Sequence, residues 1–155
     1  MAEGYNPIKI EEEILAFWDK KNTYQKVKLK NKGKEKFYFL DGPPYTSGNI
    51  HVGTAWNKSL KDSVLRYKRM KGFDVWDRAG YDMHGLPTEN RVSKKLGLKD
   101  KEEIRKFGVS KFIDECKKFS LDSLEKMNKD FERLSVWMDF KNAYATIQKE
   151  YISSE

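Results

Sequence analysis

Two adjacent prolines, Pro43 and Pro44, constrain the fold of this 155-residue chain more than any other feature, because they follow a run of strand-forming residues. Residues 37–40 (FYFL) are bulky and favour a strand. Proline has no backbone N–H, so the hydrogen-bond ladder of that strand cannot continue through the prolines. The sequence therefore predicts a buried strand that stops at Leu40 or Asp41.

The apolar residues after this loop recur at helical spacing and predict one face of a helix that ends near Gly72. They are Trp56, Leu60, Val64 and Tyr67. Residues 73–76 (FDVW) then predict a second strand. Strand, loop, helix and strand in this order form a βαβ unit, whose two strands are parallel. The predicted fold class is therefore α/β.

The segments on either side of this unit are predicted to be mainly helical. Residues 10–18 carry apolar side chains at helical spacing and predict a leading amphipathic helix. From residue 24 to 39 lysines alternate with other residues around Gly33, which predicts a hairpin or extended arm turning at that glycine. Its lysines favour a solvated face over a nucleic-acid site. Further helices are predicted over residues 89–96, 101–107 and 109–134, and the tail shows no closing element.

Composition places the chain among soluble cytosolic proteins. No apolar run approaches the length of a membrane span, and the first residues lack the order of a signal peptide. The single cysteine, Cys116, cannot form an internal disulfide and falls in an apolar helix stripe, where it predicts inert packing. A net charge of +7 suits a partner that carries phosphates, although lysines also serve solubility.

Two unusual loops are predicted to lie side by side. Residues 41–54 and 80–85 both follow strands, and ligands of open parallel sheets bind outside the carboxyl ends of the strands. Gly48 and Gly53 allow a close approach to the backbone, and the helix start after His51 offers free amides to a phosphate. An ordinary proline-rich turn with a capping histidine is the alternative interpretation.

The residues of both loops resemble sequence motifs of a known family. PPYTSGNIHVGT resembles the HIGH signature of class I aminoacyl-tRNA synthetases, and GYDMHGLPTEN resembles the amino-acid-pocket segment of their isoleucine branch, in its archaeal or eukaryotic form. Thr54 stands where the signature has a second histidine. The resemblance implies that residues 37–155 form the first half of a Rossmann-like (HUP-type) catalytic domain, cut before the editing insertion, with residues 1–36 as a leading helix and basic arm. No KMSKS-like loop, editing domain or anticodon-binding domain is recognised, so the chain is expected to be an amino-terminal fragment.

The resemblance also implies a reaction and its residues. The parent enzyme would join isoleucine to ATP with Mg²⁺, release pyrophosphate, and transfer the isoleucyl group to tRNA(Ile). The implied catalytic residues are His51 and Thr54, and no metal ligand is implied. The implied isoleucine site is Gly42, Pro43 and Asp82, and the role of His84 is open. The implied ATP site comprises Pro44, Tyr45, Gly48, His51, Gly53, Thr54 and Asn57.

Several alternatives remain at this point. Another class I synthetase, of the valine, leucine or methionine type, shares much of the pattern, and small nucleotidyltransferases share an HxGH-like signature on a similar half-fold. A basic RNA-binding module would use the lysine-rich arm. A metal site built from His51, Asp82, His84 and Cys116 lacks any zinc-like spacing. The isolated chain is expected to be weakly active or inactive and to self-associate through an exposed strand edge.

Overall fold

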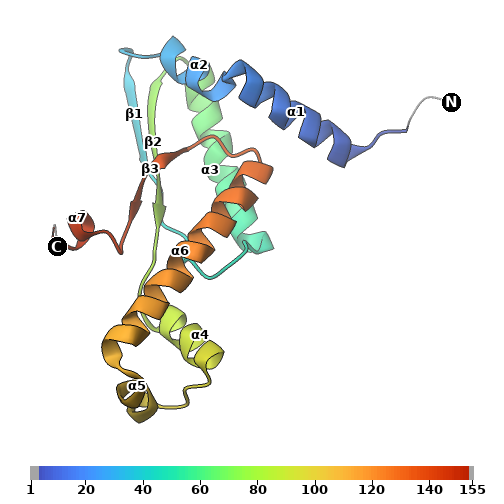
Figure 1. Ribbon diagram of the computed structural model, residues 1–155. Coiled ribbons are helices and arrows are strands. Elements are labelled where there is room, and N and C mark those ends of the chain that lie inside the picture. The colour runs from blue at the N-terminus through green and yellow to red at the C-terminus, as the bar shows by residue number, and fades with distance from the viewer. Residues whose placement is uncertain (1–3, 154–155) are drawn as a thin grey trace.

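A three-stranded parallel sheet with helices on one side organises the chain, as a computed structural model that describes residues 4–153 shows (Figure 1). The strands lie in the order β1 (Lys36–Leu40), β2 (Asp74–Tyr81) and β3 (Asp139–Ala145), and both pairings are parallel. Helix α3 (Val52–Met70) joins β1 to β2, so the predicted βαβ unit and the α/β class are confirmed.

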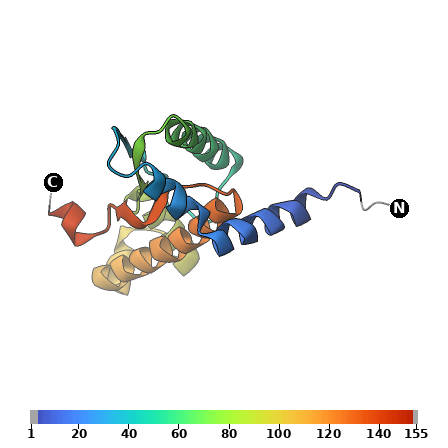
Figure 2. The same ribbon diagram turned by 90° about the horizontal axis from the view of Figure 1, so that it is seen from above.

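The helices between β2 and β3 also agree with the sequence pattern. They are α4 (Leu86–Leu96), α5 (Lys101–Phe107) and α6 (Val109–Arg133). The core forms between the sheet, α3 and α6, where Leu65, Tyr81 and Phe131 are fully buried. The leading helix α1 (Pro7–Lys21) projects away from the sheet (Figures 1 and 2). None of the described helices is long and apolar enough to cross a membrane.

Strand β1 lies at an edge of the sheet, and the prediction that it is buried was wrong. Its side chains alternate between half-buried and exposed, with Tyr38 70% and Leu40 59% exposed. Because α3 and α6 cover only one face of the sheet (Figure 1), the outward side chains of β1 and β2 meet solvent. The rings of Tyr38 and Trp76 lie side by side on this open face, with their centroids 6.2 Å apart. One face of the sheet is therefore open, and β1 and β3 are the two edge strands among the described residues.

Helix α3 faces the sheet with a different side from the one its apolar stripe predicts. The predicted core residues Trp56, Leu60, Val64 and Tyr67 are 48–67% exposed. The buried residues are Lys58, Asp62, Leu65 and Arg69, three of them charged. The charged ones are paired on the inward side, so the helix packs through ion pairs as well as through apolar contact.

The predicted basic hairpin is a helix, α2 (Thr23–Lys30), followed by a turn in which Gly33 has φ +83°. The period-two lysines misled the sequence interpretation, because the inward contacts recur every three or four residues. Tyr24 donates to Asp77, Lys28 pairs with the same carboxylate, and the Asn31 amide caps the carbonyl of Arg69 at 2.8 Å. These tertiary contacts fix a helix where alternation suggested extended chain.

The tail holds a third strand that the sequence did not indicate. Strand β3 pairs with β2, with a register irregularity between Arg78 and Gly80, and the short helix α7 (Lys149–Ile152) follows it. Gly80 belongs to β2 rather than to a loop, and the Tyr144 ring lies directly against it.

We expect Gly80→Ala to destabilise the fold by about 1–3 kcal/mol, the usual range for overpacking. A Cβ at Gly80 would lie 2.2 Å from two ring carbons of Tyr144, so the ring must leave its position. Urea unfolding measures the loss, and Gly4→Ala is the control because a Cβ there meets no atom within 4 Å. Equal stability of the two variants would contradict the prediction.

Candidate functional site

The two glycine-containing loops lie against one another, as their strand-end positions predict. Tyr45 and Asp82 form a parallel bridge, in which the Asp82 amide donates to Pro44 O at 3.0 Å and the Thr46 amide donates to Asp82 O at 2.9 Å. The Tyr45 hydroxyl reaches the carbonyl oxygen of His84 at 2.8 Å. The loop after β1 is thereby joined to the loop after β2.

His51 stands at the amino end of α3 and caps it. The Thr54 amide donates to His51 Nδ1 at 3.2 Å, and the Thr54 hydroxyl lies 3.1 Å from His51 Nε2. Gly53 keeps room for this ring, because a Cβ there would approach His51 Cε1 to 3.0 Å. His51 therefore caps α3, as the alternative interpretation of this loop predicts. Its imidazole is exposed beside the free amides of the first helical turn.

A pocket of about 510 Å³ opens between this turn and the first loop. It gathers eight of the ten residues that the sequence assigns to ATP and isoleucine and omits Gly48 and Asp82. Gly48 has φ +116° and shapes the loop. The residues that line the pocket are Gly42, Pro43, Pro44, Tyr45, Ser47, Asn49, Ile50, His51, Gly53, Thr54, Asn57, Lys61 and Met127.

Asp82 is half-buried in the second loop, next to Tyr45 of the pocket wall. Its backbone is fully engaged in the bridge, whereas no hydrogen bond or ion pair of its carboxylate is found among residues 4–153. A half-buried carboxylate without a cation is suited to receive an ammonium group. His84 is exposed, and the only hydrogen bond found for it in the described part of the chain is accepted by its backbone carbonyl.

Neighbouring helices hold the first loop, through residues that the sequence interpretation missed. Asp130 of α6 accepts from the Ile50 amide at 2.9 Å, and Arg91 of α4 donates to Ser47 O. Lys58 and Lys61 of α3 both reach the Asp41 carboxylate. Charged residues on helices look solvent-facing in a sequence, so only the position of Asp41 directly after a strand could have pointed to this cluster.

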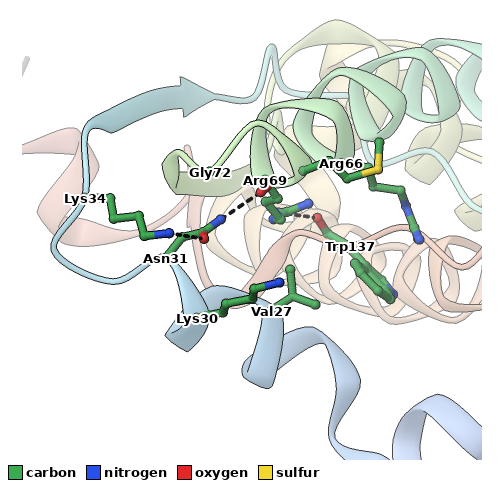
Figure 3. A pocket seen from close by; sticks show the side chains of 9 residues that line it. Val27, Lys30, Asn31, Lys34, Arg66, Arg69, Gly72 and Trp137 are labelled. Carbon is green, nitrogen blue, oxygen red and sulfur yellow. Dashed lines mark hydrogen bonds between the residues drawn. The ribbon is translucent and has the colours of Figure 1, made fainter.

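A second pocket, of about 570 Å³, lies near the amino ends of the strands, away from the two loops (Figure 3). Its lining is rich in cations and includes Lys30, Lys34, Arg66 and Arg69. Both arginines are already paired, Arg66 with Asp62 and Arg69 with Asp77. Two lysines of the 26–36 run are engaged as well, Lys28 with Asp77 and Lys36 with Asp74. These four cations therefore serve internal contacts.

No metal site emerges from the described residues. Between residues 4 and 153 no three His, Cys, Asp or Glu side chains come close enough to hold an ion. Cys116 lies partly buried on α6, and burial raises the pKa of its thiol. The loop pocket contributes no carboxylate, so an ion there would depend on ligand oxygens.

Comparison with known proteins decides the family. The family model described as tRNA synthetases class I (I, L, M and V) matches residues 13–155. The chain belongs to this family. Curated relatives include the isoleucine–tRNA ligases of Pyrococcus furiosus, 55% identical over 151 residues, and of Methanothrix thermoacetophila, 49% identical over 150 residues. Each comparison covers 97% of this chain and 14% of the relative, so the chain spans about one seventh of their length.

A solved class I enzyme shares the fold. The structure is a ternary complex of the Agrobacterium radiobacter K84 LeuRS with tRNA and LeuAMS. It superposes with a TM-score of 0.66 and 28% identity, over 89% of this chain and 16% of the LeuRS chain. The predicted family and the predicted half-fold of parallel strands with flanking helices are confirmed.

Proposed function

We propose that this chain carries the ATP and isoleucine sites of an isoleucine–tRNA ligase. The observation that supports it most directly is the pocket between the loop after β1 and the start of α3, which gathers eight of the ten assigned residues. Asp82 lies next to Tyr45 of its wall, and its carboxylate has no hydrogen-bond or ion-pair partner among residues 4–153. Relatives that are isoleucine–tRNA ligases at about half identity favour isoleucine over leucine, valine or methionine. Residues 37–155 then form the first half of the catalytic domain, after a leading segment over residues 1–36.

The pocket would promote adenylate formation by positioning ATP and isoleucine against one another. ATP phosphates would lie at the amino end of α3, where His51 and Thr54 can donate hydrogen bonds and the helix start favours negative charge. The isoleucine carboxylate attacks the α-phosphorus, the bond from that phosphorus to the bridging oxygen breaks, and pyrophosphate leaves. The carboxylate is already a nucleophile, so no general base is required.

The remaining residues of the pocket would hold the two substrates. Gly42 and Pro43 form one wall of the isoleucine site, and Asp82 receives the ammonium group. Pro44, Tyr45, Gly48, Gly53 and Asn57 complete the ATP site, with Gly53 leaving space for base or sugar. Mg²⁺ would arrive on the ATP phosphates, because the pocket offers it no carboxylate. In the whole enzyme tRNA(Ile) would be the acceptor, in the cytoplasm.

A hybrid enzyme tests this function. In it, the matching 151 residues of the Pyrococcus furiosus isoleucine–tRNA ligase are replaced by this chain. We expect isoleucine-dependent ATP–pyrophosphate exchange in the hybrid, and its loss in the His51→Ala hybrid. The isolated chain should show little or no exchange. Exchange that survives His51→Ala would contradict the role of the first loop.

Asp82→Asn should raise the Kd of the hybrid for isoleucine by roughly 10- to 150-fold, the value of a hydrogen bond to a charged group, and leave the Kd for ATP within about threefold. The change removes the counter-charge of the ammonium and touches no phosphate site. Isothermal titration with each ligand separately makes the comparison. An equal loss for both ligands would indicate a folding defect instead.

We also expect the isolated chain to self-associate, through the open edge of β1 and the exposed apolar stripe of α3. Trp56→Glu on that stripe should shift the chain toward the monomer in analytical ultracentrifugation. Lys71→Gln is the matched control, because it changes the net charge by the same one unit at an exposed position at the end of α3. A chain that is monomeric at all concentrations would refute this prediction.

A further inference from the structure

A lysine is buried directly behind the loop pocket. Lys58 of α3 is 1% exposed, and its ammonium contacts the carboxylate of Asp41 and lies 4.6 Å from the centre of the Phe131 ring. Burial lowers the pKa of Lys58, while the Asp41 charge opposes that shift. A buried ammonium is unfavourable where an apolar side chain of similar length could pack, so its value must lie in the geometry that it sets.

Asp41 is the residue that Lys58 holds, and all of its polar groups are engaged. Its amide donates to Arg78 O on β2 at 3.1 Å, and its carbonyl accepts from the Tyr144 hydroxyl on β3 at 2.6 Å. One carboxylate oxygen accepts from Lys58 and the other from Lys61 at 2.8 Å. Asp41 therefore joins α3 to two strands at the first position of the loop.

Lys61 carries this connection into the pocket. Its Nζ donates to Asp41 Oδ1 and, at 3.1 Å, to the carbonyl oxygen of Gly42. Lys61 also lines the pocket, whereas Lys58 does not. Two lysines and one aspartate give this cluster a net charge of +1, and the partly exposed member of the cluster is the one that faces the pocket.

We propose that Lys58 is a positioning residue for the substrate loop. Through Asp41 and Lys61 it fixes the backbone of Gly42 and Pro43, and by occupying one oxygen of Asp41 it leaves Lys61 with positive charge at the pocket wall. The identity of the ligands rests on the proposed function. The position of the loop does not, and it can be measured on the 155-residue chain without any ligand.

Hydrogen–deuterium exchange of the isolated chain tests the positioning. In Lys58→Met we expect the amides of residues 41–54 to exchange at least about tenfold faster, because the buried Asp41 loses a cation, while α6 stays protected to within about twofold. Lys71→Met removes the same charge from an exposed position of the chain and should change neither segment. Unchanged exchange in residues 41–54, or equal acceleration in α6, would overturn the proposal.

The double variant Asp41→Asn/Lys58→Met removes both buried charges, so it should fold even where the single variant does not. If Lys58 acts through Asp41, residues 41–54 exchange in the double variant about as fast as in Lys58→Met. Exchange as slow as in the unchanged chain would show that the ion pair does not position the loop, and would overturn the proposal.

Kinetics of the hybrid enzyme separate positioning from chemistry. We expect Lys58→Met to raise the KM for isoleucine at least about tenfold and to change kcat less than about threefold, because the wall of the substrate site is displaced. A loss in kcat alone would overturn the proposal. If the hybrid that carries this chain without any substitution were inactive, that result would count against the proposed function. Hydrogen–deuterium exchange of the isolated chain would then decide the role of Lys58.

Discussion

Asp77→Ala should remove a large part of the free energy of unfolding of this protein. Asp77 is 1% exposed on β2 and accepts from Tyr24 at 2.6 Å and from Arg69, with Lys28 Nζ at 3.1 Å. Removing one partner of a buried ion pair costs about 3–5 kcal/mol, a large share of the 5–15 kcal/mol that stabilises a typical domain. The loss would affect α2, α3 and β2 together, because each supplies a member of this network.

The guanidinium of Arg69 makes this loss large. It is buried, and its Nε and Nη1 have no hydrogen-bond partner among the described residues. Without Asp77 the partner that remains is the carbonyl oxygen of Trp137, at 3.0 Å. A buried charge with so few contacts is strongly unfavourable.

Urea unfolding of Asp77→Ala and Asp74→Ala measures the effect. Asp74 lies on the same strand, pairs with Lys36 at 2.6 Å and accepts from the Gly33 amide at 2.9 Å. The Lys36 side chain is half exposed, so removing Asp74 leaves no buried charge unpaired and should shift the midpoint less than Asp77→Ala does. The double variant Asp77→Ala/Arg69→Met should recover much of the loss, because no unpaired charge stays buried. Equal midpoints for Asp77→Ala and Asp74→Ala would show that the network adds nothing.

The βαβ unit could be predicted because its signals are local. Pro43 and Pro44 end a strand wherever they occur, and the stripe from Trp56 to Tyr67 has helical spacing in any environment. Which side of α3 meets the sheet is not a local property. The stripe lies outward, and Lys58, Asp62 and Arg69 lie inward, because their partners belong to other elements of the fold.

Helix α2 and strand β3 escaped prediction for a related reason. The lysines of residues 26–36 show a period of two, but Tyr24, Lys28 and Asn31 contact the rest of the fold at helical spacing. Strand β3 has the sequence DFKNAYA, which lacks clear alternation, and its pairing depends on β2, which lies far away in sequence. Non-local contacts override weak local preference.

The contact between the two loops of the candidate site could be predicted from the order of the strands, but the buried charged cluster behind them could not. The carboxyl ends of parallel strands share one edge, so the contact of Tyr45 with Asp82 follows from the order of elements. The cluster of Asp41, Lys58 and Lys61 does not follow from that order, because a lysine on a helix is solvated in most proteins.

Gly53→Val should weaken ATP binding by about a hundredfold, or about 2.8 kcal/mol, because its methyl groups block the pocket wall and displace the His51 ring that would contact the phosphates. A Cβ at this position lies 3.0 Å from His51 Cε1 and 3.1 Å from Nδ1, so the imidazole must move. The moved ring can no longer accept from the Thr54 amide, and the new methyl groups occupy space at the pocket wall.

Titration of the hybrid enzyme with ATP measures this loss, and circular dichroism of the same samples checks that the fold is kept. Gly4→Val is the control, since a Cβ there meets no atom within 4 Å. Photolabelling with an azido-ATP analogue then maps the site on the chain itself. Labels on residues 41–57 that disappear in Gly53→Val would agree with the proposed site. Labels on the lysines of residues 26–36 that persist in this variant would contradict it, because α2 and the turn after it lie toward the opposite end of the sheet from the amino end of α3 (Figure 1).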